Sequence, residues 1–173
     1  DYIQRGYSKT DDRAALQLHA NLTPTARGPL AGAYAGTWVN RVQLGEARWE
    51  AVPYVGWRRA VGRDWQVDGT IAGYLYDERF EAGGGRSAHY GEIYGAAHYG
   101  DWLSLRAGAA VAPYGIGGVA PEVEVKLRRP LSDVLMASLS VGHAWLGDFA
   151  GYEVTHAAVG VGWVLSRRLQ ADL

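Results

Sequence analysis

Apolar side chains recur at odd-numbered positions from residue 48 to residue 173, in one short run after another. In the stretch RWEAVPYVGWR, which begins at Arg48, the odd positions carry Trp49, Val55 and Trp57. The even positions carry several polar or charged residues, such as Glu50. Successive side chains of a β-strand point to opposite faces of the sheet, so each run predicts a strand with one apolar and one polar face.

The residue types on the two faces indicate the solvent that each face meets. The apolar face is built from Val, Leu, Ile and Ala with Trp near its ends, whereas the other face carries charges at mid-strand. A soluble barrel buries its apolar face, but a membrane barrel turns that face toward lipid and keeps a polar lumen. The pattern therefore favours an all-β, antiparallel, up-and-down transmembrane β-barrel. A soluble ligand-binding barrel of the lipocalin type is the alternative fold.

The composition agrees with a membrane barrel and excludes several other classes of protein. Seven Trp and eleven Tyr accompany only two Phe, and amphipathic Trp and Tyr rings suit a lipid–water interface. The absence of cysteine excludes disulfides, and no apolar run approaches the ~18 residues of a membrane-spanning helix. A net charge of −1 gives no sign of a nucleic-acid partner. No linker or low-complexity segment divides residues 1–173, so we expect one domain.

The alternation, together with the turn residues between the runs, predicts eleven strands. Before about residue 45 the parity is less regular, because Leu16, Leu18 and Leu22 place the apolar face on even positions. Most of the strands are long enough to cross a bilayer at a tilt, which takes ~9–11 residues. The expected strands cover residues 1–7, 14–22, 31–43, 47–60, 65–77, 88–99, 102–113, 120–129, 133–146, 152–165 and 168–173.

Short and long connections alternate along most of the chain. Short periplasmic turns opposite longer external loops are typical of outer-membrane barrels. Tight turns, with Gly, Asp and Pro in turn positions, are expected at 62–64, 100–101, 130–132 and 166–167. Longer loops are expected at 8–13, 77–87, 114–119 and 146–151. Two connections break the alternation, the long 23–30 and the short 45–46.

Tryptophans near the strand ends predict the two aromatic belts that flank the lipid-facing band of such a barrel. Trp49 and Trp57 are eight positions apart on one face, or roughly 26 Å at ~3.3 Å per residue. At a tilt of about 40° this distance becomes roughly 20 Å of height, close to the ~25 Å of an apolar band. The expected belt residues are Trp49, Trp57, Trp65, Trp102, Trp145 and Trp163.

The even positions predict the lining of the lumen. The candidate pore residues are Arg48, Glu50, Arg58, Asp68, Glu92, Arg106, Glu122, Glu124, Lys126 and Arg128. Acids and bases balance in this set, which argues against a strong preference for anions or cations. Ion pairs among them would give a plugged interior, because an unpaired buried charge is costly. The alternative is a narrow water-filled channel in which the charged run from Glu122 to Arg128 forms a polarised wall.

Catalysis and metal binding have little support in the sequence. The five histidines are scattered over different strands, whereas a metal site needs three or four converging ligands. An outer-membrane hydrolase would pair Ser138 or Ser140 with His156 and an acid. Strands of a barrel bring such residues near one another by chance, so we expect no enzyme activity, no metal and no cofactor.

Four motifs occur in order in the first hundred residues. They are DYIQRGYS at the start, YAGTW from Tyr34, the pair Glu50 and Tyr54, and YGEIYG from Tyr90. Together they resemble the motifs of the TorF-type porins, a family of bacterial outer-membrane proteins whose functions are largely unassigned. The glycine that ends YGEIYG lies one position earlier than in the family. Beyond the first hundred residues the similarity is one of pattern alone.

The resemblance implies a β-barrel in the outer membrane of a Gram-negative bacterium, with pore activity assumed for the family. Family members have strand residues before the Asp-Tyr motif and end in an aromatic residue, whereas this chain ends at Leu173. If both termini lie in the periplasm the number of strands must be even, so eleven strands imply a twelfth. The chain is thus expected to be a segment, truncated at both ends, of a 12-stranded barrel, with 10 strands as the alternative.

The sequence therefore predicts a porin or narrow channel for small polar solutes, surrounded by outer-membrane lipid. The main alternative is a non-conducting structural or interaction barrel that uses its loops at 77–87 and 146–151 to meet a partner or a polysaccharide. An outer-membrane hydrolase is the third hypothesis. The pattern assigns no oligomeric state.

Overall fold

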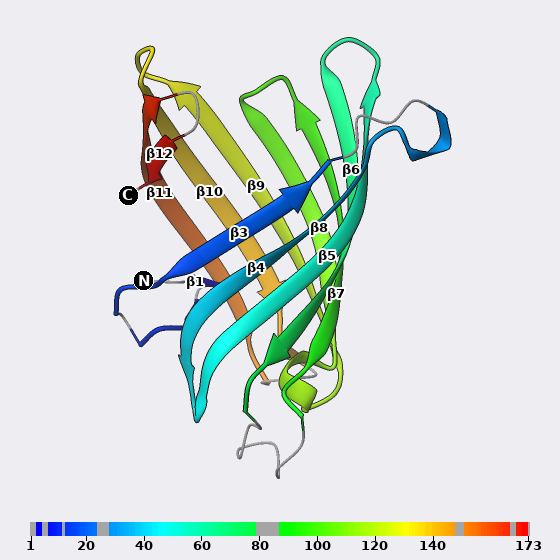
Figure 1. Cartoon of the computed structure of the whole chain (residues 1–173), viewed down its shortest axis with the longest axis vertical. Helices are drawn as coiled ribbons and strands as arrows, with labels where there is room; N and C mark the ends of the chain where they lie inside the picture. The colour runs from blue at the N-terminus through cyan, green and yellow to red at the C-terminus, as the bar shows by residue number, and fades with distance from the viewer. Residues whose placement is uncertain are drawn as a thin grey trace.

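Ten β-strands of the chain form one antiparallel sheet (Figure 1). The computed structural model describes residues 3–4, 7–11, 13–23, 28–78, 87–147, 151–166 and 169–172. A separate pair of two-residue strands, β1 and β2, lies near the N-terminus. In these described ranges no helix is both long enough and apolar enough to cross a membrane.

Each strand of the sheet pairs with its neighbours in the sequence, which gives an up-and-down order from β3 to β12. The sheet contains ten of the eleven predicted strands, with bounds that shift by a few residues. The strands are β1 (Ile3–Gln4), β2 (Tyr7–Ser8), β3 (Gln17–Leu22), β4 (Ala33–Leu44), β5 (Ala47–Val61), β6 (Trp65–Tyr76), β7 (Tyr90–Tyr99), β8 (Leu103–Val111), β9 (Val119–Pro130), β10 (Leu135–Trp145), β11 (Glu153–Ser166) and β12 (Leu169–Asp172).

The sheet has ten strands where the sequence predicts eleven, and it is not closed into a barrel. The sheet is open, with β3 and β12 as its two edges, and no pairing joins these edges within the described ranges. The described residues of the strand predicted at 1–7 do not join the large sheet, and β1 and β2 form a two-stranded sheet of their own. The physical reason lies in this segment's side chains. Gln4 and Lys9 have hydrogen-bond partners on the inner face of the large sheet.

From β5 to β11, short turns lie at one end of the sheet and longer connections at the other (Figure 1). The turns β5–β6, β7–β8 and β9–β10 lie at the end that we call the short-turn end, which is uppermost in the figure. The connections β6–β7, β8–β9 and β10–β11 lie at the opposite, long-loop end. Gly45, Gly62 and Gly100 have φ angles of 57°, 72° and 51° in their turns, a conformation that glycine adopts without a steric penalty.

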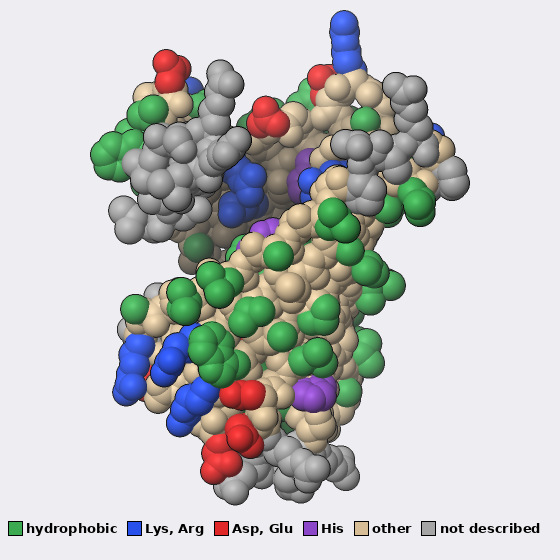
Figure 2. Space-filling model, viewed as in Figure 1, with side chains coloured by type: hydrophobic (Ala, Val, Ile, Leu, Met, Phe, Trp, Pro, Cys, Tyr) green, Lys and Arg blue, Asp and Glu red, His purple; other side chains and the backbone are tan. Residues whose placement is uncertain are grey.

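The two faces of the curved sheet differ in polarity, and the polarity is inverted relative to a soluble protein. Odd positions of β5–β11 lie on the outer face, where Val55, Ile71 and Val159 are 58%, 60% and 80% exposed. Even positions lie on the inner face, where Glu50 and Glu92 are 0% and 2% exposed. Figure 2 shows hydrophobic side chains spread over the outer surface of the strands. Apolar side chains therefore face outward and acids inward, whereas soluble proteins bury the apolar set.

On β3 the even positions carry the outward apolar side chains, in contrast to β5–β11, as the sequence indicates. Leu18 pairs with Val39, and Leu22 pairs with Ala35. Antiparallel partners share a face of the sheet, so the even positions of β3 lie on the outer face. The odd positions of β3 consequently face inward, and His19 lies opposite Trp38 on the inner face.

Candidate functional site on the inner face

The inner face of the sheet carries two groups of polar side chains. One group lies near the long-loop end and contacts the described residues of the N-terminal segment, 3–4, 7–11 and 13, which we call the insert. The other group consists of residues from β4 to β11, with Arg58 and Asp68 nearer the short-turn end. Both groups follow from strand alternation, because the antiparallel register places even-numbered residues of neighbouring strands side by side.

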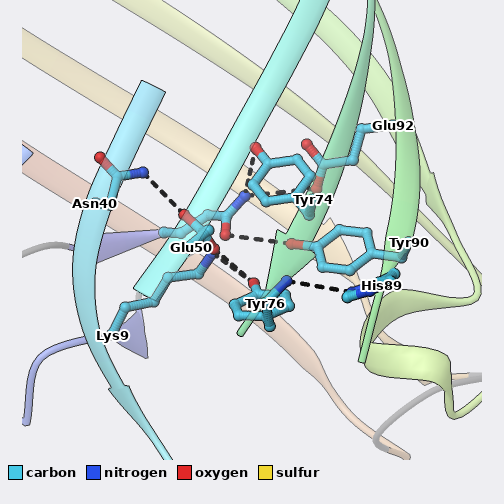
Figure 3. Close-up of polar contacts among 9 residues, drawn as sticks. Lys9, Asn40, Glu50, Tyr74, Tyr76, His89, Tyr90 and Glu92 are labelled. Atoms are coloured by element: carbon cyan, nitrogen blue, oxygen red, sulfur yellow. Dashed lines mark hydrogen bonds and ion pairs between the residues drawn. The ribbon is translucent and has the colours of Figure 1, made fainter. Parts of the chain in front are cut away.

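The insert is anchored by an ion pair between Lys9 and Glu50, whose side chains are 1% and 0% exposed. The Tyr76 hydroxyl donates a hydrogen bond to Oε2 of Glu50 at 2.5 Å, and Nδ2 of Asn40 donates to Oε1 at 2.9 Å (Figure 3). Lys9 Nζ also donates to the Tyr76 hydroxyl at 3.2 Å. Each buried charge thus has an opposite charge and neutral polar partners, which offset its desolvation.

Tyrosine rings enclose the ammonium group of Lys9. Its Nζ lies 4.9 Å from the ring centroid of Tyr74, 5.7 Å from that of Tyr76 and 5.9 Å from that of Tyr114. Tyr74 in turn stacks on Tyr90 with ring centroids 4.5 Å apart. A cation within about 6 Å of a ring face is attracted by the ring, so the tyrosines add to the ionic anchor.

Gln4 provides a second anchor for the insert. Its Nε2 donates to the Tyr74 hydroxyl at 2.9 Å and to Oε1 of Glu92 at 3.5 Å. Through Gln4 and Lys9 the insert contacts side chains of β5, β6 and β7. The insert therefore fills part of the inner face near the long-loop end.

A carboxylate on β6 is held firmly in the second polar group. Arg58 on β5 donates from Nε to Oδ2 of Asp68 at 2.8 Å. The Tyr34 hydroxyl donates to Oδ1 of the same carboxylate at 2.6 Å, and the Thr70 hydroxyl donates to it at 2.9 Å. Asp68 therefore accepts hydrogen bonds from three residues, and Arg58 also forms an ion pair with it.

An ion pair joins β8 to β9, and a contact between a histidine and a carboxylate joins β9 to β11. Nη2 of Arg106 lies 3.2 Å from Oε1 of Glu122, and the guanidinium carbon of Arg106 is 3.7 Å from the ring centroid of Tyr94. Nε2 of His156 lies 3.8 Å from Oε2 of Glu124. Of the four charged residues from Glu122 to Arg128 that the sequence predicts as a polarised wall, Glu122 and Glu124 therefore have partners on neighbouring strands.

A pocket of about 350 Å³ opens on the inner face beside these pairs. Its lining includes His19, Trp38 and Tyr54. The His19 ring stacks on Trp38 with centroids 4.0 Å apart, and its Nε2 is 2.6 Å from the Tyr54 hydroxyl. Aromatic rings with hydroxyl and amide groups among them suit a small polar ligand.

Gly108 lets the Tyr94 ring lie against the backbone of β8. A Cβ atom at residue 108 would be 2.3 Å from Cδ1 of Tyr94 and 2.6 Å from the carbonyl oxygen of Ile93. We therefore expect Gly108→Ala to displace Tyr94 and to lower the free energy of unfolding by about 1–3 kcal/mol. Urea unfolding in detergent measures this loss. Gly69→Ala is the matched control, since a Cβ there would meet nothing within 4 Å. Equal stability of the two variants would contradict the prediction.

Nine of the ten predicted pore residues lie on the inner face, at the even positions of β5–β9. Arg48 is the exception. Its Nη1 donates to the carbonyl of Gly45 at 2.9 Å, so its side chain is turned toward the β4–β5 turn. The pairing register shifts between Arg41 and Leu44, and this irregularity accounts for the local change of direction. The role of all ten residues in a pore stays a prediction.

The six tryptophans predicted to form belts are exposed and lie toward the ends of the sheet. Trp49 and Trp145 lie near the long-loop end, whereas Trp57, Trp65, Trp102 and Trp163 lie near the short-turn end. The seventh, Trp38, faces inward. Trp38 is not among the site residues that the sequence predicts, although its even position in a strand with outward odd positions is a usable signal. Lys9 is not among them either, because it falls in the predicted loop 8–13.

The residues of the hydrolase hypothesis are separated along β10. His156 lies opposite Gly142, two positions beyond Ser140 and four beyond Ser138. Ser138 donates to the carbonyl of Gly160 at 3.5 Å. Within the described ranges, no group of three or more His, Cys, Asp or Glu residues is arranged to hold a metal ion.

The fold and the site together define a class: an all-β protein with one antiparallel up-and-down sheet, apolar outside and polar inside. No family model matches the chain, and no curated protein or solved structure matches it either. The resemblance to the TorF-type porins therefore stays a prediction.

Proposed function

We propose that the chain is an outer-membrane β-barrel whose inner face lines a narrow channel for small polar solutes. One observation carries this proposal, the inverted polarity of the sheet. The exposed Val, Leu and Ile side chains of the outer face would be hydrated in solution, whereas lipid would bury them at a gain of about 25 cal/mol per Å². Tryptophans near both ends of the sheet suit the two membrane interfaces.

The proposal includes closure of the sheet by pairing of β3 with β12. Unpaired backbone N–H and C=O groups at a strand edge cost several kcal/mol each in hydrocarbon, so an open edge does not persist there. β3 runs toward the short-turn end and β12 runs away from it, which permits antiparallel pairing. Ten strands would then form the ring, an even number, as is usual in bacterial barrels.

The insert favours a second candidate function, a non-conducting structural barrel. It occupies the inner face near the long-loop end and is held there by a buried ion pair. In the channel proposal the insert narrows the pore, and solutes pass beside it or after it moves. In the structural proposal it seals the lumen, and the long loops meet a partner.

Reconstitution of the full chain into planar lipid bilayers tests these functions. We expect insertion, discrete conductance steps and a gel mobility in SDS that changes on heating, as a closed barrel would give. A protein that inserts and shows the heat-dependent mobility but stays silent supports the structural barrel. A protein that remains monomeric in buffer without detergent contradicts both functions and favours the soluble ligand-binding alternative.

A further inference from the structure

We propose that Lys126 and Arg128 form a binding site for small oxyanions, such as inorganic phosphate or a carboxylate, on the inner face near the short-turn end. The inference deepens the proposed function, on which its consequence for solute selectivity rests. The anion binding itself follows from the placement of side chains on β8, β9 and β10.

The two cations are neighbours on one face of one strand. They are two positions apart on β9, so their side chains leave the same side of the sheet. Within the described part of the chain, neither side chain forms an ion pair or a hydrogen bond. Arg58 and Arg106 already form ion pairs with Asp68 and Glu122, and Nε2 of His156 lies 3.8 Å from Oε2 of Glu124.

The structure also changes the charge balance that the sequence suggests. Five acids and five bases balance in the predicted pore set, but Glu50 and Glu92 lie near the long-loop end, where they contact the insert. The Arg48 side chain is directed toward the β4–β5 turn. The seven remaining residues of the set are four bases, Arg58, Arg106, Lys126 and Arg128, and three acids, Asp68, Glu122 and Glu124. Figure 2 shows Lys, Arg and His side chains gathered in a hollow beyond β3.

Serine hydroxyls flank the two cations. Lys126 lies opposite Ser104 on β8 and Ser140 on β10, and Arg128 lies opposite Ser138 on β10. Directly opposed residues in antiparallel strands have Cβ atoms about 4.5–5.5 Å apart, so these three hydroxyls surround the cations.

This donor set matches the chemistry of an oxyanion. A guanidinium group can donate two parallel hydrogen bonds to a carboxylate or a phosphate, an ammonium group adds a point charge, and the Ser140 hydroxyl can donate to a remaining oxygen. Ser104 Oγ lies 2.9 Å from Nδ1 of His98, which positions the hydroxyl beside Lys126. A neutral solute would use the hydroxyls but would leave both charges without a partner.

Isothermal titration of the full chain in detergent with inorganic phosphate tests the site. We expect saturable binding, and at least 10-fold weaker binding by the double variant Lys126→Gln/Arg128→Gln. Arg129→Gln is the matched control, because Arg129 carries the same charge on the same strand but lies on the outer face. The charge-conserving variant Lys126→Arg/Arg128→Lys should bind within a few-fold of the original and so separates lost charge from lost folding. No saturable binding, or an equal loss in Arg129→Gln, overturns the inference.

The reversal potential in a KCl gradient across a planar bilayer tests the consequence for selectivity. We expect a preference for anions that Lys126→Gln/Arg128→Gln abolishes and Arg129→Gln retains. A conducting protein that prefers cations, or whose preference the double variant leaves unchanged, overturns the selectivity and leaves the channel function intact. A silent protein that binds phosphate overturns the channel function and leaves the anion site intact.

Discussion

Replacing Val55 with Arg is expected to destabilise the membrane-inserted protein by about 2–4 kcal/mol, the range for a lipid-facing cation at the bilayer midplane. Val55 lies in the middle of β5 on the outer face and is 58% exposed. If lipid covers this face, the guanidinium group must enter hydrocarbon. The change in the free energy of unfolding from lipid vesicles, measured by urea titration, gives the size of the effect.

The same strand supplies the control for this prediction. Val61 ends β5 at the short-turn end and is 50% exposed, so the two valines differ mainly in their height along the strand. An Arg near the interface should cost only about 0–1 kcal/mol, because the cost falls with distance from the midplane. In a soluble protein, Arg at either exposed position would have little effect. Equal stability of the Val55→Arg and Val61→Arg variants would therefore rule out a lipid-covered outer face.

Replacing Lys9 with Met is expected to release the insert from the inner face. The substitution leaves the carboxylate of Glu50 buried without its cation, and breaking a buried ion pair in this way typically costs about 3–5 kcal/mol. Hydrogen exchange at the backbone amides of residues 3–13 should rise, because the insert loses its main anchor. In bilayers the single-channel conductance should increase, since the insert no longer fills the lumen near the long-loop end.

A second substitution separates the ion pair from the shape of the side chain. Glu50→Gln keeps one acceptor oxygen, for Asn40 or for Tyr76, but removes the negative charge that Lys9 balances. The double variant Lys9→Met/Glu50→Gln should therefore recover much of the protection of the insert that Lys9→Met loses. Unchanged exchange and conductance in Lys9→Met would show that the ion pair does not hold the insert.

The strands could be predicted from the sequence because their signal is local. Alternation over ten or so residues depends only on the two faces of one strand, and Gly62 and Gly100 mark turns within the same short windows. This alternation correctly predicts which side chains of β5 are exposed, Trp49 and Trp57, and which lie on the inner face, Glu50 and Arg58. The same odd–even alternation also assigns the polar side chains to one face of the sheet and the apolar side chains to the other.

The insert and the edges of the sheet could not be predicted, because they depend on contacts between distant residues. Lys9 meets a carboxylate 41 positions away, and Gln4 meets one 88 positions away. No local pattern distinguishes a short alternating segment that extends a sheet from one that folds onto its inner face. The direction of Arg48 could not be predicted for a similar reason. The alternation places its side chain on the inner face, but a register irregularity between β4 and β5 directs it toward the turn.

The pairing of every strand in the sheet with its sequence neighbour has a consequence for the order of assembly. Each hairpin from β3–β4 to β11–β12 closes a loop much shorter than the separation of Lys9 from Glu50, and shorter loops close at a smaller cost in chain entropy. Such hairpins can form as soon as their two strands are available, whereas Lys9 and Gln4 find their partners only once β5, β6 and β7 are side by side. The first residues of the chain are thus among the last to reach their native contacts, and docking of the insert marks the completion of folding in this half of the sheet.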